Sequence, residues 1–137
     1  MRFVDTNILL YFVGRDEAES AQQAIAAGLL EATDLALSVQ VLQEFYVQAT
    51  RPTREDPLRH RDALALIESW KRYPIQETTL ALVEQALAAK LRWNISYWDA
   101  AIIEAARLLG CPELLSEDLA DGQDYDGVRV INPFAVA

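Results

Sequence analysis

The chain has 137 residues and a formal net charge of −9; 52% of its residues are apolar and 24% are charged. This composition predicts one globular domain over residues 1–137, and no apolar run approaches the roughly 20 residues of a membrane-spanning helix, which argues against a membrane partner. The acidic balance argues against a protein that grips nucleic acid through an overall positive surface, and an acidic residue at position 5 argues against a secretory leader, so we expect a cytoplasmic protein.

The hydrophobic pattern alternates short strands with longer helices. Strands are predicted over residues 2–4, 35–38, 74–75, 113–115 and 128–131. Helices are predicted over residues 8–13, 16–31, 39–50, 58–72, 79–92 and 96–109. Helical segments between short strands indicate parallel pairing through crossovers, so the fold class is α/β: a three-layer α/β/α sandwich around a central, mainly parallel sheet of four to five short strands.

Two of these helices show a clear apolar side. The helix over 79–92 carries an apolar stripe of Leu80, Val83, Leu87 and Leu91. The helix over 39–50 buries an apolar stripe of Val41, Leu42, Phe45 and Tyr46. Glu44 lies roughly 130° from the centre of the second stripe, so periodicity alone predicts an exposed glutamate there.

The scarcity of cysteine and histidine excludes several chemistries. Cys111 is the single cysteine and His60 the single histidine. An internal disulfide, a Cys/His zinc site and a Ser-His-Asp triad therefore have no support. We expect His60 on the surface and Cys111 buried or half-buried.

Carboxylates follow two of the predicted strands. Asp5 comes directly after the first strand, and Asp118 comes shortly after the strand over 113–115. Open α/β sheets bind ligands beyond the carboxyl ends of their strands, so these positions favour a site. Both residues are also suited to turns and helix caps, which is the alternative for each. A calcium loop is excluded at Asp118, because Leu119 would occupy a position that needs an oxygen ligand.

Asp99 lies on the apolar side of the helix over 96–109. On a helical wheel it falls within roughly 30° of the centre of the buried stripe, so we expect it to point inward. The spacing of Ser96 and Asp99 also fits a capping box. The two interpretations are compatible, because a first-turn position can aim a carboxylate toward the sheet edge.

The cations are unevenly distributed. Six of the twelve basic residues fall within positions 51–72, beginning just after the helix that carries Glu44. The first four are Arg51, Arg54, Arg59 and Arg61, and they are candidates for contacts to nucleic acid phosphates, with a solvated surface as the alternative. Trp93 and Trp98 are candidates for base stacking, with core or interface packing as the alternative.

Four short motifs resemble, in order and spacing, the acidic motifs of PIN-domain ribonucleases, and most closely those of VapC-type toxins of toxin–antitoxin pairs. The motifs are Asp5-Thr6-Asn7, Gln43-Glu44-Phe45, the Ser-Tyr-Trp-Asp-Ala-Ala-Ile run at 96–102 and the Leu-Leu-Ser-Glu-Asp-Leu run at 114–119. The segment over 127–134, which contains the last predicted strand, is also similar to that family's last strand. The resemblance spans the whole chain.

The resemblance implies a metal-dependent endoribonuclease. Its catalytic and metal-binding residues would be Asp5, Glu44, Asp99 and Asp118, and its metal Mg²⁺, with Mn²⁺ as the other candidate. Hard divalent ions prefer oxygen ligands and would offset the repulsion between such carboxylates. The residues expected to orient these ligands are Thr6, Asn7 and Ser116. Glu117 and Asp121 lie close enough in sequence to compete with Asp118.

The same resemblance implies three kinds of partner: an RNA substrate, a cognate antitoxin protein and a second copy of the chain in a homodimer. Two other functions stay open from the sequence. One is a metal-dependent phosphatase of the haloacid dehalogenase kind, which has an Asp two residues after its first strand-end Asp, where this chain has Asn7. The other is a non-catalytic α/β interaction module, against which the four intact acidic motifs argue.

Overall fold

A computed structural model describes residues 1–135 of the protein. The strands are β1 (Arg2–Val4), β2 (Leu35–Ser38), β3 (Ile75–Gln76), β4 (Glu113–Leu115) and β5 (Arg129–Ile131). The helices are α1 (Thr6–Val13), α2 (Ser20–Leu29), α3 (Val39–Ala49), α4 (His60–Trp70), α5 (Leu80–Trp93) and α6 (Tyr97–Leu108), and a short 3₁₀ helix covers Glu17–Glu19.

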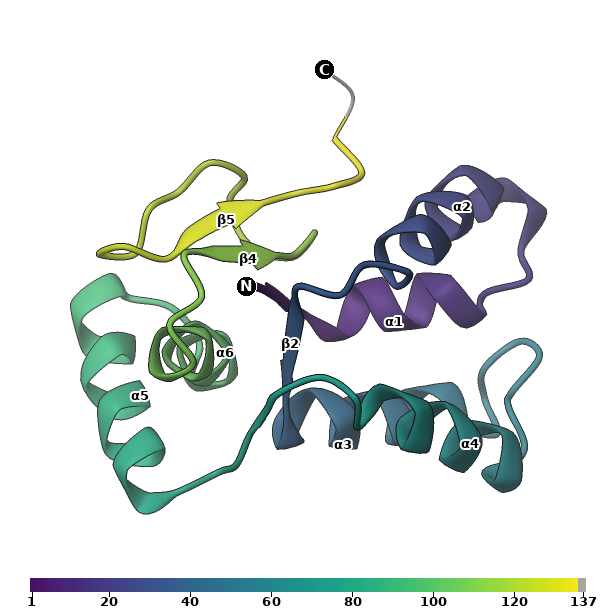
Figure 1. The fold of residues 1–137 in the computed structure, drawn as a ribbon, viewed down its shortest axis with the longest axis horizontal. Helices are drawn as coiled ribbons and strands as arrows, with labels where there is room; N and C mark the ends of the chain where they lie inside the picture. The colour runs from purple at the N-terminus through teal and green to yellow at the C-terminus, as the bar shows by residue number, and fades with distance from the viewer. Residues whose placement is uncertain (136–137) are drawn as a thin grey trace.

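The strands form one five-stranded parallel sheet in the order β3-β2-β1-β4-β5. Helices α5 and α6 cover one side of this twisted sheet, and α1 to α4 lie on the other (Figure 1). The predicted three-layer α/β/α architecture is confirmed. The strand order runs from β1 toward β3 on one side and from β1 to β4 and β5 on the other. The carboxyl ends of β1 and β4 therefore flank the topological switch point, where such sheets bind ligands.

The sheet and the helix faces that cover it build the main hydrophobic core. Its largest fully buried side chains come from the strands and from the inner sides of three helices; they include Phe3, Ile8, Leu37, Phe45, Ile103 and Leu114. The predicted positions of the single cysteine and histidine are also confirmed. Cys111 is buried beside this core, and His60 is exposed, with its Nδ1 atom 2.9 Å from the Tyr46 hydroxyl.

The apolar stripe predicted for the helix over 79–92 is wrong. Leu80, Leu87 and Leu91 are 74%, 54% and 87% exposed, whereas Leu82 and Ala86 are buried. Ala86 and Ala89 of α5 pack against Ala100 and Ala101 of α6, so the close helix contact uses the alanine face of α5 and leaves the three exposed leucines outside. Periodicity located the helix correctly but chose the wrong face, because close helix packing can prefer small side chains to large ones.

The segment after α1 is also more broken than predicted. Asp16 accepts a hydrogen bond from the Ala18 backbone N–H at 3.0 Å, but the helix that it caps is only the 3₁₀ turn, and α2 begins at Ser20. Within residues 1–135, no helix has both the length and the apolar content needed to cross a membrane.

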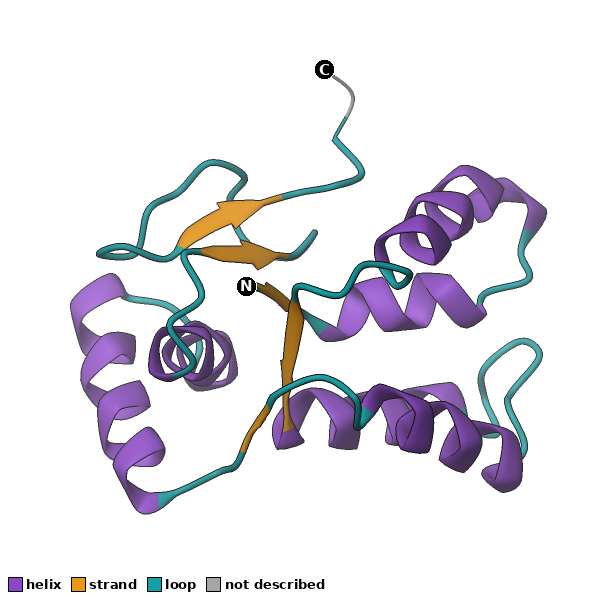
Figure 2. Ribbon diagram, in the orientation of Figure 1, coloured by secondary structure: helices purple, strands orange, loops and turns teal. Residues whose placement is uncertain are grey.

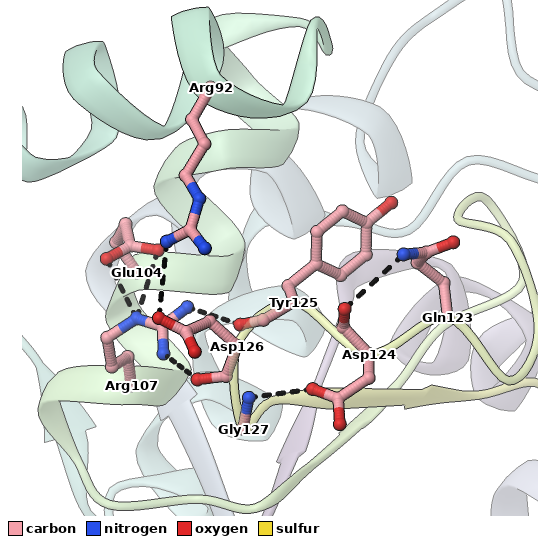
Figure 3. Close-up of polar contacts among 8 residues, drawn as sticks. All are labelled: Arg92, Glu104, Arg107, Gln123, Asp124, Tyr125, Asp126 and Gly127. Atoms are coloured by element: carbon pink, nitrogen blue, oxygen red, sulfur yellow. Dashed lines mark hydrogen bonds and ion pairs between the residues drawn. The ribbon is translucent and has the colours of Figure 1, made fainter.

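The connection between β4 and β5 contains no helix within its residues 116–128 and is drawn entirely as loop (Figure 2). Arg107 of α6 holds its far end (Figure 3). Its guanidinium donates to the backbone carbonyls of Tyr125 and Asp126 at 2.5 and 2.6 Å, and its Nε lies 3.0 Å from the buried Glu104 carboxylate. Parallel strands usually need a helical crossover. Here the ion pair of Arg107 and Glu104 orders a connection that contains no helix.

Candidate active site

The candidate site lies where β1 and β4 end side by side. The backbone N–H of Asp5 donates to the carbonyl of Leu115, the last residue of β4, at 3.0 Å, which extends the ladder one residue beyond the end of β1. The chain then turns into α1 after β1 and into the 116–128 connection after β4. Residues following two neighbouring strand ends therefore meet, as the sequence predicted for Asp5 and Asp118.

Asp5 is the buried centre of the site. Its side chain is the N-cap of α1: one oxygen accepts from the Thr6 backbone N–H at 2.7 Å, and the other accepts from the Ser116 hydroxyl at 2.7 Å. Burial raises the pKa of Asp5 to about 7, and the negative charges of Asp118 and Glu44 add to this rise, although the two hydrogen bonds oppose it. The capping and site interpretations of Asp5 are thus both compatible with its geometry.

Glu44 lies across the site on α3. One carboxylate oxygen accepts from the Thr6 hydroxyl at 3.0 Å, and the other accepts from the Gln40 amide at 2.7 Å. The exposed position expected from periodicity is wrong, because Glu44 is half-buried against α1. Helix α3 presents its apolar stripe to the sheet and a second, polar side to the first turn of α1.

Asp118 joins the same network through Asn7 and Ser116. Its carboxylate accepts from the Asn7 amide at 3.2 Å, and its backbone N–H donates to the Ser116 hydroxyl at 3.1 Å. Asn7 also accepts from the Glu117 backbone N–H at 3.2 Å. Thr6, Asn7 and Ser116 therefore each link two parts of the site through hydrogen bonds.

The two competing acidic residues have other partners. Glu117 accepts from the Tyr11 hydroxyl at 2.8 Å, and burial together with this carboxylate raises the pKa of Tyr11 to about 12, so the hydroxyl stays a neutral donor. Asp121 accepts from the backbone N–H of Asn132 at 2.9 Å. These contacts favour Asp118 over Glu117 and Asp121 as the acidic residue of the site.

Asp99 stands apart from the other three carboxylates. It is half-buried in the first turn of α6, where its backbone N–H donates to the Ser96 hydroxyl at 3.1 Å. The turn is held beside α3, because Gln40 donates to the Trp98 carbonyl at 3.3 Å. Burial and the charge of Asp99 raise the pKa of Tyr125. Sequence reasoning missed Gln40, although its i,i+4 spacing to Glu44 is a detectable signal.

Comparison with protein families finds a match to the PIN domain over residues 2–120. That range covers β1 to β4, all six α-helices and the four acidic positions. The chain belongs to the PIN domain family. A search of curated proteins found no match to this PIN domain.

Solved structures share the fold of this PIN domain at low sequence identity. A toxin–antitoxin complex from Klebsiella pneumoniae is 22% identical with a TM-score of 0.72, covering 99% of this chain and 100% of that chain. VapC20 from Mycobacterium tuberculosis, a sarcin-ricin loop cleaving toxin, is 24% identical with a TM-score of 0.67, covering 86% and 92%. FitAcB from Neisseria gonorrhoeae is 16% identical with a TM-score of 0.64, covering 99% and 100%.

The four acidic residues of this PIN domain have no cationic partner in the described part of the chain. Asp5, Glu44, Asp99 and Asp118 form no ion pair within residues 1–135. Their oxygen donors suit a hard divalent cation such as Mg²⁺ or Mn²⁺. Within residues 1–135, no three His, Cys, Asp or Glu side chains lie close enough together to hold a metal ion. The donor chemistry therefore fits the metal, whereas the side chains do not form a closed ligand shell.

The arginines of the predicted basic segment face different surroundings. Arg51 lines a cavity that also contains Glu44. Arg54 lines a second cavity beside Asp16 and Glu19, and Arg59 lines a third beside Asp62. Arg61 is an exposed residue of α4. Of the four, Arg51 is the one that shares a cavity with a candidate carboxylate.

Proposed function

We propose that this protein is a metal-dependent endoribonuclease that hydrolyses RNA phosphodiester bonds. One observation carries the proposal: a PIN domain buries Asp5 at its topological switch point, with Glu44 and Asp118 beside it, and gives this negative charge no cation from residues 1–135. Burying the Asp5 carboxylate beside the negative charges of half-buried Glu44 and exposed Asp118 is unfavourable without compensation, so a site of this kind is suited to an external cation.

Asp5 and Asp99 are the principal ligands in this proposal, and Asp118 completes the set. Glu44 holds a water or a second ion. A bound divalent ion supplies Lewis-acid chemistry: it lowers the pKa of water and stabilises the departing oxygen of the phosphodiester. The chain itself orients the ligands. Ser116 holds Asp5, Thr6 holds Glu44 and Asn7 holds Asp118.

The proposal includes a biological role as the toxin of a toxin–antitoxin pair in the cytoplasm. Structures with the same fold include a toxin–antitoxin complex, a VapC toxin and FitAcB. The leucines that α5 leaves exposed offer an apolar surface for a protein, either the antitoxin or a second copy in a homodimer. If co-expression with the product of the neighbouring gene leaves RNA cleavage and growth arrest unchanged, the antitoxin role fails.

Cleavage of an RNA pool by the purified protein tests the catalytic proposal. With Mg²⁺ or Mn²⁺, Asp5→Asn and Asp99→Asn should each lower the cleavage rate at least about 100-fold, since even groups that only orient metal ligands contribute 10- to 100-fold. Asp62→Asn, an exposed first-turn residue of α4, is the matched control and should cleave like the wild type. Chelation by EDTA should abolish cleavage. Activity that survives both site substitutions would reject the metal site.

A further inference from the structure

A cavity of about 440 Å³ opens directly beside Glu44. One wall is a stripe of α3 at helical spacing that starts at Gln40, passes Glu44 and Val47, and ends just past the helix at Arg51. The opposite wall is Trp98, from the first turn of α6. The cavity therefore begins at a candidate catalytic carboxylate and leads away from it along α3.

Trp98 is exposed but held in place. Its side chain is 64% exposed, whereas Trp70 is 2% exposed in the core and Trp93 packs edge-on against Tyr125 at 5.2 Å. The Trp98 ring contacts Tyr97 at a centroid distance of 5.0 Å, and its backbone carbonyl accepts from Gln40. Of the two tryptophans that the sequence offered for stacking, Trp98 lines the cavity that contains Glu44, whereas Trp93 lines a different cavity beside Arg92 and Glu104.

The polar groups of the cavity have unused hydrogen-bonding capacity. Gln43 and Gln48 line it and form no side-chain hydrogen bond with residues 1–135, so each offers both a donor and an acceptor. Arg51 is exposed and forms no ion pair within the same range. Seven residues separate it from Glu44, which is about 10 Å along a helix axis.

We propose that this cavity binds one base of single-stranded RNA next to the cleaved phosphodiester. The base stacks on Trp98, the glutamine amides face its edge, and Arg51 contacts a neighbouring phosphate. This inference rests on the proposed nuclease function and adds a substrate subsite to it. An aromatic ring, amides with free donors and acceptors, and a lone cation form the combination that recognises an unstacked nucleotide.

The charge distribution favours RNA over a protein occupant. The chain carries a net charge of −9, so an RNA strand must approach a largely acidic molecule. Arg51 supplies a positive charge where the strand would leave the carboxylates. Because the cavity begins at a candidate catalytic carboxylate, we assign it to the substrate, and a contact with another protein chain is an outcome that the test below distinguishes.

Substitution of Trp98 tests the subsite through RNA affinity as well as cleavage. The probes are a random-sequence pool of short single-stranded RNA and polyuridylate; binding is measured in EDTA, and cleavage with Mg²⁺ or Mn²⁺. Trp98→Ala should raise both Kd and KM about 10- to 100-fold, because loss of base–aromatic stacking has effects of this size. Trp98→Phe should keep most of the affinity. Ile25→Ala, at an exposed apolar residue of α2 outside both proposed surfaces, is the matched control and should change neither constant.

Two further readouts separate stacking from a general structural effect. RNA should quench the tryptophan fluorescence of the wild type, and this quenching should disappear in Trp98→Phe although binding persists. Arg51→Ala should weaken binding and lower the salt dependence of log K by about 0.7, the value for one contact to a single-stranded phosphate. Arg129→Ala, at an exposed arginine of β5, is its control.

The outcomes distinguish the subsite from the nuclease itself. Cleavage by the wild type with unchanged KM and Kd in Trp98→Ala would overturn the subsite and leave the nuclease function standing. A Trp98→Ala variant that sediments as a smaller species but binds RNA normally would identify the cavity as a contact between chains, which also overturns the subsite. A wild type that neither binds nor cleaves either RNA would overturn both proposals.

Discussion

The two ends of the connection between β4 and β5 differ in whether a cation of the chain pairs with the carboxylates there. At the start, Ser116 and Asp118 enter a group of carboxylates held only by neutral donors. At the end, Arg107 supplies charge-assisted hydrogen bonds to two backbone carbonyls and pairs with Glu104 (Figure 3). The loop of thirteen residues, 116–128, thus begins at carboxylates that have no cationic partner within residues 1–135 and ends beside the ion pair of Glu104 and Arg107.

The presence or absence of a cationic partner distinguishes a buried acid that belongs to the fold from one that belongs to a candidate site. Glu104 is buried like Asp5, but its charge is compensated by Arg107 one helical turn away, so the fold itself supplies its cation. Asp5 has no such partner within residues 1–135, and burial raises its pKa. Burial of an acid is therefore a weak sign of function, and burial without a cationic partner is a stronger one.

The largest expected effect on stability is the pH dependence caused by Asp5. Its pKa is about 7 in the folded protein, above the usual 3.9 or so of an unfolded aspartate. The folded state then binds a proton that the unfolded state releases between pH 4 and pH 7. The stabilisation by protonated Asp5 is complete below pH 4 and is lost as pH rises through 7, about 4 kcal/mol in total. Urea unfolding in EDTA across this range measures it.

Asp5→Asn is the matched variant for this measurement. The amide is uncharged, can accept from the Thr6 N–H and can donate to the Ser116 hydroxyl, so both hydrogen bonds of the side chain have a counterpart. We expect it to unfold at higher urea than the wild type at pH 8 and to lack the wild-type slope. If the unfolding free energies of the two proteins depend on pH in the same way, ionisation of Asp5 does not destabilise the fold. Asp5 would then not differ from Glu104 in this respect.

Arg107→Ala should have the next largest effect, in the opposite direction. It leaves the buried Glu104 carboxylate unpaired and removes the donors to the carbonyls of Tyr125 and Asp126. We expect a loss of about 3 kcal/mol of unfolding free energy at pH 7, at the lower end for a broken buried pair because Arg107 is 31% exposed. Chemical denaturation measures this loss.

The control for Arg107 is Arg129→Ala, whose 3.8 Å pair with Asp124 is exposed on both sides and should contribute little. RNA cleavage by Arg107→Ala, measured where the variant is folded, should stay within about tenfold of the wild type, since Arg107 touches none of the four candidate carboxylates. A folded but inactive Arg107→Ala variant would mean that catalysis at the start of the loop depends on the contacts that Arg107 makes at its end.

The smallest effect is expected for Arg92. It pairs with Asp126 at 3.2 Å and lies over the Trp93 ring at 4.5 Å, but both charged side chains are more than half exposed. Arg92→Ala should lower the unfolding free energy by about 1 kcal/mol or less. Thermal unfolding beside Arg107→Ala measures the difference. A loss as large as that of Arg107→Ala would show that the surface pair, and not the buried one, holds the loop.

The sequence predicted most of what is local in this fold. The strands over 35–38 and 113–115 and the cap at Ser96 agree with the structure, because alternation, turn residues and side-chain caps act within a few residues. The face of α5 was predicted wrongly, since a pattern of leucines carries no information on which side a neighbouring helix approaches. The exposure of Glu44 was wrong for the same reason.

Sequence patterns alone predicted the α/β order, the carboxylates that follow β1 and β4, and the motifs that resemble a PIN domain. Tertiary packing set the burial of Asp5, the hydrogen bonds through which Thr6 and Ser116 link it to Glu44 and Asp118, and the exposure of Trp98 beside the cavity that Glu44 also lines. These features depend on distances between segments about 40 to 110 residues apart, which are set by strand order and helix packing and have no counterpart in local periodicity.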